Sequence, residues 1–245
     1  MERVLPTGTM EIVIDLRGGG LRLHDRLDPC KTQDFAGALV AGPHTRFFVI
    51  DTSRPGALLG VHFRPGGAFP FFDLPISELG NVHVPLAALW GSAAAELSER
   101  VTMAQNAEAI FSSLEQSLLL RLSRPDARHR AIAFALAQLC RAAQSWKIAD
   151  LAEHVGLSQR RFIDLFGSEV GLRPKRFSRV LRFQRALRLI NRTTAIDWTA
   201  LALDCGYYDQ AHFIHDFQEF CSVAPTAYAA LRSEHENHLR HPAAT

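Results

Sequence analysis

The sequence predicts an α+β protein with two domains, a β-rich one over residues 1–124 and an all-α one over residues 128–235. Three observations predict this division. Short apolar runs separated by Gly and Pro turn signals fill the first part of the chain, as expected of an antiparallel barrel or sandwich. Helical patterns follow and would flank the strands of the first domain. Two helix-turn-helix patterns, joined by a long basic helix, then occupy the second domain.

The β-rich half contains four strand candidates, each a short run of apolar or alternating residues. They are Glu11–Leu16, Leu21–Leu27, Thr45–Asp51 and Ala57–Phe63. Turn signals separate or follow them at Gly18–Gly20, Arg54–Gly56 and Pro65–Gly67. Two helices are expected after the strands, because Ala, Leu and Glu dominate there with few helix breakers. They are Ala93–Thr102 and Asn106–Arg121.

The second domain is predicted to begin after a short linker, Arg124–Ala127, because Pro125 disfavours a helical residue before it. A helix over Ala131–Ala143 would open the domain. The other helices outside the paired motifs run from Pro174 to about Asn191 and from Thr226 to about Glu236. Residues 236–245 are expected to form a frayed polar tail.

The two helix-turn-helix patterns, Ile148–Phe166 and Trp198–Phe217, have similar layouts. Aligned on Gly156 and Gly206, each has Leu-Ala before the turn and two Phe residues four positions apart after it. Phe residues at that spacing lie on one face of a helix and can pack on the helix that carries the Leu-Ala pair. The two glycines are expected at positive φ in the turns.

Polar residues mark the helix starts and the exposed faces of both units. Side-chain oxygens at a helix start can accept free backbone N–H groups, and this predicts three N-caps. They are Ser145, Ser158 and Asp209. The second helix of each unit would leave a polar face exposed. That face holds Gln159, Arg160 and Asp164 in the first unit, and Gln210, Ala211 and His215 in the second.

The basic charge of the chain is local. Its formal net charge is only +2, yet residues 130–192 hold 13 Lys/Arg against four Asp/Glu, a net charge of +9. Residues 1–129 carry a net charge of −2, and residues 193–245 a net charge of −5. A basic segment confined to the helix-turn-helix region favours binding to a polyanion over a general effect on solubility.

These features together favour recognition of double-stranded DNA. A recognition helix fits the major groove and presents its exposed residues to base edges, while basic residues and helix N-termini hold phosphates. The base-contact candidates are Gln159, Arg160 and Asp164 in the first unit, and Gln210, Ala211 and His215 in the second. The phosphate-contact candidates are Ser158, Arg161, Lys175, Arg176, Arg179 and His212.

Residues 128–235 resemble the DNA-binding domain of the AraC/XylS family of bacterial transcription regulators. The matching residues are Leu151-Ala152, Gly156-Leu157-Ser158, Phe162, Phe166, Gly171, Pro174, Gly206-Tyr207, Phe213, Phe217, Pro225 and Tyr228. The resemblance implies seven helices, two of which read adjacent major grooves about one helical turn of DNA apart. Two positions depart from the family pattern, since Asp164 replaces a basic residue and Ser222 replaces a glycine.

The N-terminal half resembles the β-rich, cupin-like sensor or dimerisation domains that accompany such regulators. The resemblance rests on the stretch from Phe63 to Gly67 and on Leu89-Trp90-Gly91. His62 and Phe63 are ligand-contact candidates, because their strand would line a small barrel on one side. The competing interpretation is an ordinary core strand with a hydrogen-bonded histidine.

Enzymatic and metal chemistry find little support in the sequence, so we expect neither a catalytic site nor a metal or other cofactor. The histidines of the N-terminal half lack close metal-ligand spacing. Neither a phosphate-binding glycine loop nor a GxSxG nucleophile motif is present. Two alternatives stay open: a barrel metalloenzyme fused to a DNA-binding module, and an architectural protein whose DNA binding no metabolite alters.

The expected setting is the bacterial cytoplasm. Neither an export signal nor a membrane-spanning run is apparent, and the four cysteines form no CxxC pair. The expected partners are double-stranded DNA, a small-molecule effector, RNA polymerase and a second copy of the chain. The expected function is sequence-specific transcription regulation. Activation is the expected effect, and repression stays open as the alternative.

Overall fold

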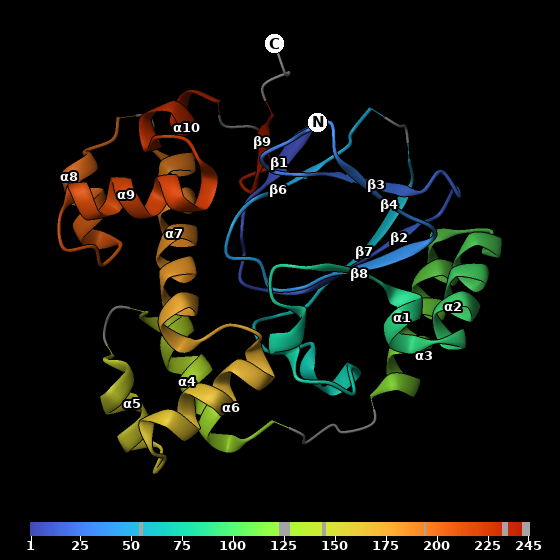
Figure 1. Cartoon of the computed structure of the whole chain (residues 1–245), viewed down its shortest axis with the longest axis horizontal. Helices are drawn as coiled ribbons and strands as arrows, with labels where there is room; N and C mark the ends of the chain where they lie inside the picture. Colours follow the sequence, from blue (N-terminus) through green and yellow to red (C-terminus); the bar gives the residue numbers. More distant parts are fainter. Residues whose placement is uncertain (54–55, 123–127, 144–145, 194, 232–234, 242–245) are drawn as a thin grey trace.

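The fold is mixed α+β, as predicted, with two antiparallel sheets in the N-terminal half and a helical C-terminal half (Figure 1). The computed structural model describes residues 1–53, 56–122, 128–143, 146–193, 195–231 and 235–241. The predicted turn at Arg54, the predicted linker Arg124–Ala127 and the predicted cap Ser145 lie outside the described residues.

The strands of the described chain form two separate sheets, so the first domain is a sandwich and not a closed barrel. The five-stranded sheet has the order β4-β3-β6-β1-β9, and the four-stranded sheet has the order β7-β2-β5-β8. The bounds are β1 Glu2–Val4, β2 Glu11–Asp15, β3 Leu21–His24, β4 Thr32–Phe35, β5 Ala38–Ala41, β6 Phe48–Ile50, β7 Leu58–His62, β8 His83–Pro85 and β9 His238–Arg240. All the strand pairings among the described residues are antiparallel.

All four predicted strands are present as β2, β3, β6 and β7. The strands that the sequence pattern did not indicate are short and lack a clear alternation. β4 has three exposed residues in four, while all four residues of β5 are buried. Such segments acquire their strand conformation from pairing with neighbours, because their own residues carry no period-2 pattern.

Helices and short 3₁₀ turns make up the rest of the fold. The first half contains η1 Phe69–Phe71, η2 Ile76–Leu79, α1 Leu86–Trp90, α2 Ser92–Met103 and α3 Ala107–Arg121. The second contains α4 Arg130–Arg141, α5 Ile148–His154, α6 Gln159–Val170, α7 Pro174–Arg192, α8 Trp198–Asp204, α9 Gln210–Cys221 and α10 Pro225–Leu231. Each predicted helix has a counterpart here. Within the described chain, no helix combines the length and apolarity needed to cross a membrane.

Three clusters of buried apolar side chains lie between the layers of the molecule. The cluster between the sheets includes Leu23 of one sheet and Leu39 of the other. A second cluster packs the four-stranded sheet against α1, α2 and α3. The third continues from the helical domain onto the five-stranded sheet, where it contains Val49 and Leu239. The core of the helical half is therefore continuous with the five-stranded sheet, so this half packs directly on the sandwich.

The expectation of a frayed tail is wrong for His238–Arg240, which form β9. This strand pairs with β1 at the edge of the five-stranded sheet, with Arg3 opposite Leu239. The backbone N–H of Leu5 also donates to the Asn237 carbonyl at 2.8 Å. Leu239 is 2% exposed. A three-residue segment gives no periodic signal, so only the free edge of β1 and the burial of Leu239 make it a strand.

Glu169 is a buried carboxyl group near the end of α6. It is 2% exposed, and its two oxygens accept the backbone N–H of His129 at 3.1 and 3.3 Å. Burial raises the pKa of Glu169 to about 7, because the backbone hydrogen bond and the charge of Arg128 only partly offset the loss of hydration. The carboxyl therefore ionises at a higher pH in the folded chain than in the unfolded one.

We expect this group to make the protein less stable as pH rises. An unfolded Glu ionises near pH 4.5 and the folded one near pH 7, so its contribution is fully present below 4.5 and is lost as pH rises through 7. Relative to Glu169→Gln, the wild-type free energy of unfolding should fall by about 1–3 kcal/mol between about pH 5 and pH 8. Urea denaturation at both pH values measures this difference. Glu153→Gln, at an exposed residue of α5, is the control; parallel pH profiles for wild type and Glu169→Gln would contradict the prediction.

Candidate nucleic-acid interface

The first helix-turn-helix unit consists of α5 and α6. Gly156 in its turn has φ +72°, as the pattern predicted. The Ser158 hydroxyl accepts the backbone N–H of Arg161 at 3.3 Å and caps α6. Phe162 and Phe166 are fully buried with the Leu-Ala pair of α5. The buried face fixes the rotation of α6 about its own axis. Its other face therefore lies in solvent, where Gln159, Arg160, Arg161 and Asp164 are exposed.

The second unit, α8 and α9, repeats this construction. Gly206 has φ +82°. Asp209 caps α9 by accepting the backbone N–H of His212 at 2.7 Å, as predicted. Asp197, which the sequence pattern did not indicate as a cap, accepts two backbone N–H groups of α8 at 3.0 Å. Phe213 and Phe217 are fully buried.

The candidate base-contact residues of the second unit differ in their exposure to solvent and in their hydrogen bonds. Ala211 and His215 are exposed on α9, whereas Gln210 is half-buried. The Thr199 hydroxyl donates to the Gln210 side-chain oxygen at 3.0 Å, which ties the start of α9 to α8. The amide nitrogen of Gln210 is not engaged in that bond. The roles of these residues in base reading stay predictions.

The long helix α7 connects the two units and supplies most of the basic charge. Val180, Phe183, Leu187 and Ile190 are fully buried on its inner side. Leu181 is half-buried beside them. Lys175, Arg185 and Arg188 are exposed along the helix. One continuous helix thus sets the spacing between the two units and also presents an exposed row of cations.

Two arginines of α7, predicted as phosphate contacts, are bound to acidic side chains of α9. Arg179 donates to both oxygens of Asp216, at 3.1 and 2.7 Å, and also to Glu219. Arg176 donates to Glu219 at 2.5 Å. Asp216 is buried, and its carboxylate also lies 3.7 Å from Arg182. We call Arg176, Arg179, Arg182, Asp216 and Glu219 the α7–α9 ion network. Its geometry fastens the second recognition helix to the connecting helix.

Asp216 and Glu219 are not among the functional residues that the sequence predicts. The sequence feature that could have pointed to them is the negative net charge of residues 193–245, which follow a basic helix. Net charge alone, however, does not indicate which residues form pairs. In the structure the pairing has clear electrostatic consequences. Burial acts to raise the pKa of Glu219, yet the hydrogen bonds from Arg179 and Arg176 outweigh it and hold the pKa below its usual value. The carboxylate thus stays ionised in the network.

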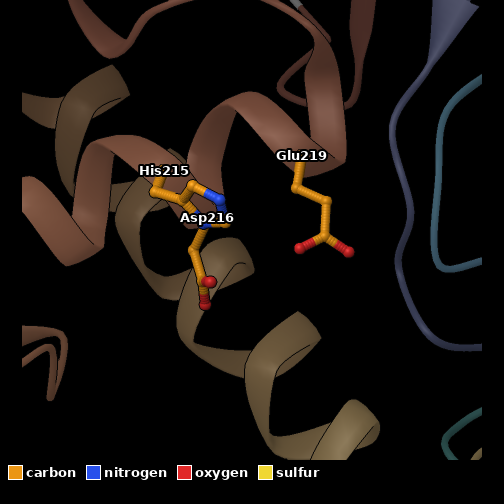
Figure 2. Close-up of side chains that lie close together, drawn as sticks. All are labelled: His215, Asp216 and Glu219. Atoms are coloured by element: carbon orange, nitrogen blue, oxygen red, sulfur yellow. The ribbon is translucent and has the colours of Figure 1, made fainter.

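His215, Asp216 and Glu219 lie close together on α9 (Figure 2). One potential ligand atom from each lies within 4.8 Å of the others. This spacing alone could suit a cation. However, both carboxylates already accept hydrogen bonds from arginines, which supply the positive charge that a metal would bring. The arrangement fits an ion network better than a metal site.

The two ligand-contact candidates of the N-terminal half have other partners. His62 is exposed, with Nδ1 2.8 Å from Glu11 Oε1 and Nε2 3.2 Å from the Thr9 hydroxyl. The bond to Glu11 raises the pKa of His62. Phe63 is 7% exposed and packs against Phe71 and Phe72 in the core. Their role in ligand binding stays a prediction, and these contacts match the competing interpretation of a hydrogen-bonded histidine beside a core residue.

A cavity of about 390 Å³ lies between the two sheets. We call it the inter-sheet cavity. Apolar side chains from both sheets line it, and polar groups stand among them. The apolar group includes Val13, Leu21, Leu39, Phe48, Ile50 and Leu58, and the polar group includes Glu11, Asp15, Asp51, His83 and His238. Neither His62 nor Phe63 is among its lining residues. An apolar cavity with a few polar groups is the usual form of a small-molecule site.

Residues 151–230 match a family described as a helix-turn-helix domain, and residues 1–85 match one described as a domain of unknown function, DUF6597. An uncharacterised helix-turn-helix-type transcriptional regulator of Haemophilus influenzae is 31% identical over 115 residues. That match covers 47% of this chain and 37% of the relative, so the chain spans less than two thirds of the length of the relative.

Solved structures with some likeness to the chain include two bacterial proteins. A transcriptional regulator with an AraC-type DNA-binding domain, from Chromobacterium violaceum, is 24% identical over 42% of this chain and 93% of that one, with a TM-score of 0.39. ToxT from Vibrio cholerae is 13% identical over 94% of each chain, with a TM-score of 0.46. Both likenesses are distant in sequence.

Proposed function

Because the chain belongs to the AraC/XylS family of regulators, we propose that it is a sequence-specific transcription regulator whose helices α6 and α9 read adjacent major grooves of DNA. The observation that carries this proposal is the repeated construction of the two units. Each has a capped recognition helix, a fully buried Phe pair and an exposed polar face, and one continuous helix links them. A recognition helix presented in this way is the form that enters a major groove.

The exposed residues supply a chemistry for base and phosphate contacts. On α6, Arg160 suits guanine and Asp164 can accept from cytosine. On α9, the amide nitrogen of Gln210, which takes no part in the bond to Thr199, can donate to a base edge. Ser158 and Asp209 leave the other N–H groups of the first turn available to phosphates. Lys175 and Arg161 are exposed cations beside these helices. We assign no catalytic role to the chain.

A small effector is proposed to act through the N-terminal half by occupying the inter-sheet cavity. Because His238 of β9 lines that cavity, an occupant would touch the strand that follows the second unit. Such an effector can shift DNA binding only if it has different affinities for two states of the protein. RNA polymerase and a second copy of the chain are further proposed partners, and the cytoplasm is the proposed location.

The test is selection of genomic DNA fragments by the purified protein at about physiological salt, where non-specific phosphate contacts are weakened. We expect a shared motif that spans two adjacent major grooves. The variant Arg160→Ala/Gln210→Ala should lose roughly 100-fold in affinity for that motif, because each good base contact contributes about 1–3 kcal/mol of discrimination.

A matched control is Arg64→Ala/Gln116→Ala, which removes the same side-chain types from exposed positions of the N-terminal half. It should retain the motif and the affinity. Recovery of unselected DNA alone, or an identical motif bound equally well by the Arg160/Gln210 variant, would refute base reading by these two residues.

A further inference from the structure

A second cavity, distinct from the inter-sheet cavity, lies where the five-stranded sheet meets the helical half. We call it the basic cleft. It has a volume of about 710 Å³. Its walls come from β3 and β4, from the loop that joins them, from residues 44–48, and from α7. Segments from both halves of the chain therefore form one cleft, at a place where a bound molecule would contact both.

Positive side chains dominate the lining of the basic cleft. Arg26, Lys31, Arg46 and Arg176 line it, against a single carboxylate, Asp25. Lys31 pairs with Asp28 at 3.3 Å, and Arg176 pairs with Glu219. Within the described part of the chain, no ion pair is recorded for Arg26 or Arg46. Like charges gathered in a cleft raise the local potential and attract anions.

The guanidinium of Arg26 is placed by an aromatic ring and not by an acid. It lies over the ring of Phe47, 5.4 Å from the centroid. A contact of this kind orients a guanidinium and leaves the N–H groups, which lie in the guanidinium plane, available to an anion. Arg26 can therefore donate to a bound anion and keep its contact with Phe47.

Two histidines add polar groups without formal charge to the cleft. His44 is 8% exposed, and its ring centroid lies 4.5 Å from that of His83. Burial lowers the pKa of His44 to about 3 and that of His83 to about 4, so both rings are neutral at neutral pH. The Nε2 atoms of both rings are buried and have no hydrogen-bond partner among the described residues. Such groups commonly mark the place of a ligand or water.

We propose that the basic cleft binds a small organic anion, with a carboxylate or phosphate group held by Arg26 and Arg46 and with Arg176 among the lining residues. The volume lies within the range of small-molecule sites. Planar guanidinium groups bind carboxylates and phosphates through paired hydrogen bonds. The lining is polar and basic, so the ligand class differs from the more apolar molecule that suits the inter-sheet cavity.

Arg176 connects this site to the recognition helices. Its Nη1 donates to Glu219 at 2.5 Å, and its Nη2 donates to the Thr45 carbonyl at 3.3 Å. An anion in the cleft would compete with Glu219 for the same guanidinium. Occupancy would therefore loosen one bond between α7 and α9. Any effect on DNA binding rests on the proposed function, whereas anion binding itself does not.

The first experiment measures anion binding without DNA. Isothermal titration calorimetry at constant ionic strength would use inorganic phosphate, succinate and citrate as probes. We expect at least one probe to bind the wild type at millimolar or lower concentration, and Arg26→Gln/Arg46→Gln to weaken it roughly tenfold or more. Arg64→Gln/Arg141→Gln, an equal charge change at two exposed residues outside the cleft, should bind like the wild type. Circular dichroism checks that each variant is folded.

A second variant gives the opposite sign and separates a specific site from a general charge effect. Glu219→Gln removes the competitor for Arg176, so it should tighten binding of the same probe several-fold. Absence of binding by all three probes, or equal binding by wild type and Arg26→Gln/Arg46→Gln, would overturn the proposal. A short DNA duplex could also abolish probe binding. If binding of that duplex required Arg26 and Arg46, the cleft would be a site for DNA phosphates and the proposal would be overturned. Failure to find a DNA motif would leave the calorimetric result unaffected.

Discussion

Gly171→Ala is expected to lower the free energy of unfolding by about 2–5 kcal/mol, as the sum of a backbone cost and a packing cost. Gly171 ends α6 at φ +87°, a conformation that L side chains rarely adopt. A Cβ atom there would lie 2.4 Å from Pro43 Cγ and 2.7 Å from Ile76 Cγ2. Both neighbours belong to the N-terminal half, so the substitution would push the two halves apart. Urea denaturation followed by circular dichroism measures the loss.

Gly156→Ala is the matched control, because it imposes the backbone cost alone. Gly156 has φ +72°, and a Cβ atom there would meet nothing within 4 Å. We expect a loss of about 1–2 kcal/mol. Equal losses for the two variants would show that the contact of Gly171 with Pro43 and Ile76 does not constrain the folded protein. A larger loss for Gly171→Ala would place the end of the first recognition helix in the interface between the halves.

Asp216→Ala is expected to cost about 2–4 kcal/mol in the free energy of unfolding, because removal of one partner leaves buried positive charge uncompensated. The Asp216 side chain is 4% exposed, and it accepts two hydrogen bonds from Arg179. The expected loss of unfolding free energy is smaller than for a fully buried pair, because the Arg179 side chain is 21% exposed and keeps its bond to Glu219. Chemical denaturation at low and high salt measures the effect, which should persist at high salt because buried pairs are poorly screened.

The control for this prediction is Asp164→Ala on α6. Asp164 is exposed, and no ion pair is recorded for it in the described part of the chain. Its loss should change stability by less than about 0.5 kcal/mol. A neutral outcome for Asp216→Ala would mean that the α7–α9 ion network contributes little to stability. The network would then orient α9 without contributing to the folding free energy.

The ion network and the docked end of α6 act on the two recognition helices in different ways. At α6, the end of the helix packs against Pro43 and Ile76 of the N-terminal half. At α9, attachment runs through Asp216 and Glu219 to α7, and through Arg176 to the Thr45 carbonyl. The end of α6 therefore contacts the N-terminal half directly, and α9 is linked to that half through Arg176 of α7. A ligand in that half has a physical route to either unit.

The sequence by itself determined the local construction of the helix-turn-helix units. Phe residues four positions apart, a glycine at each turn, and Ser158 and Asp209 at the helix starts act over one or two helical turns. These interactions depend little on the rest of the chain. The same holds for the strands β2, β3, β6 and β7, whose apolar patterns are visible within single segments. Their burial and caps in the structure follow from those patterns.

Only the tertiary structure decided which distant groups meet. Nothing near His238 predicts that it would pair with β1, and nothing near Asp216 or Glu219 predicts which arginines they would bind. The inter-sheet cavity and the basic cleft likewise arise from segments far apart in the sequence. Local patterns report the conformation of a segment and the face it buries, whereas strand pairing, ion pairing and cavities depend on the contacts that the whole chain makes when it folds.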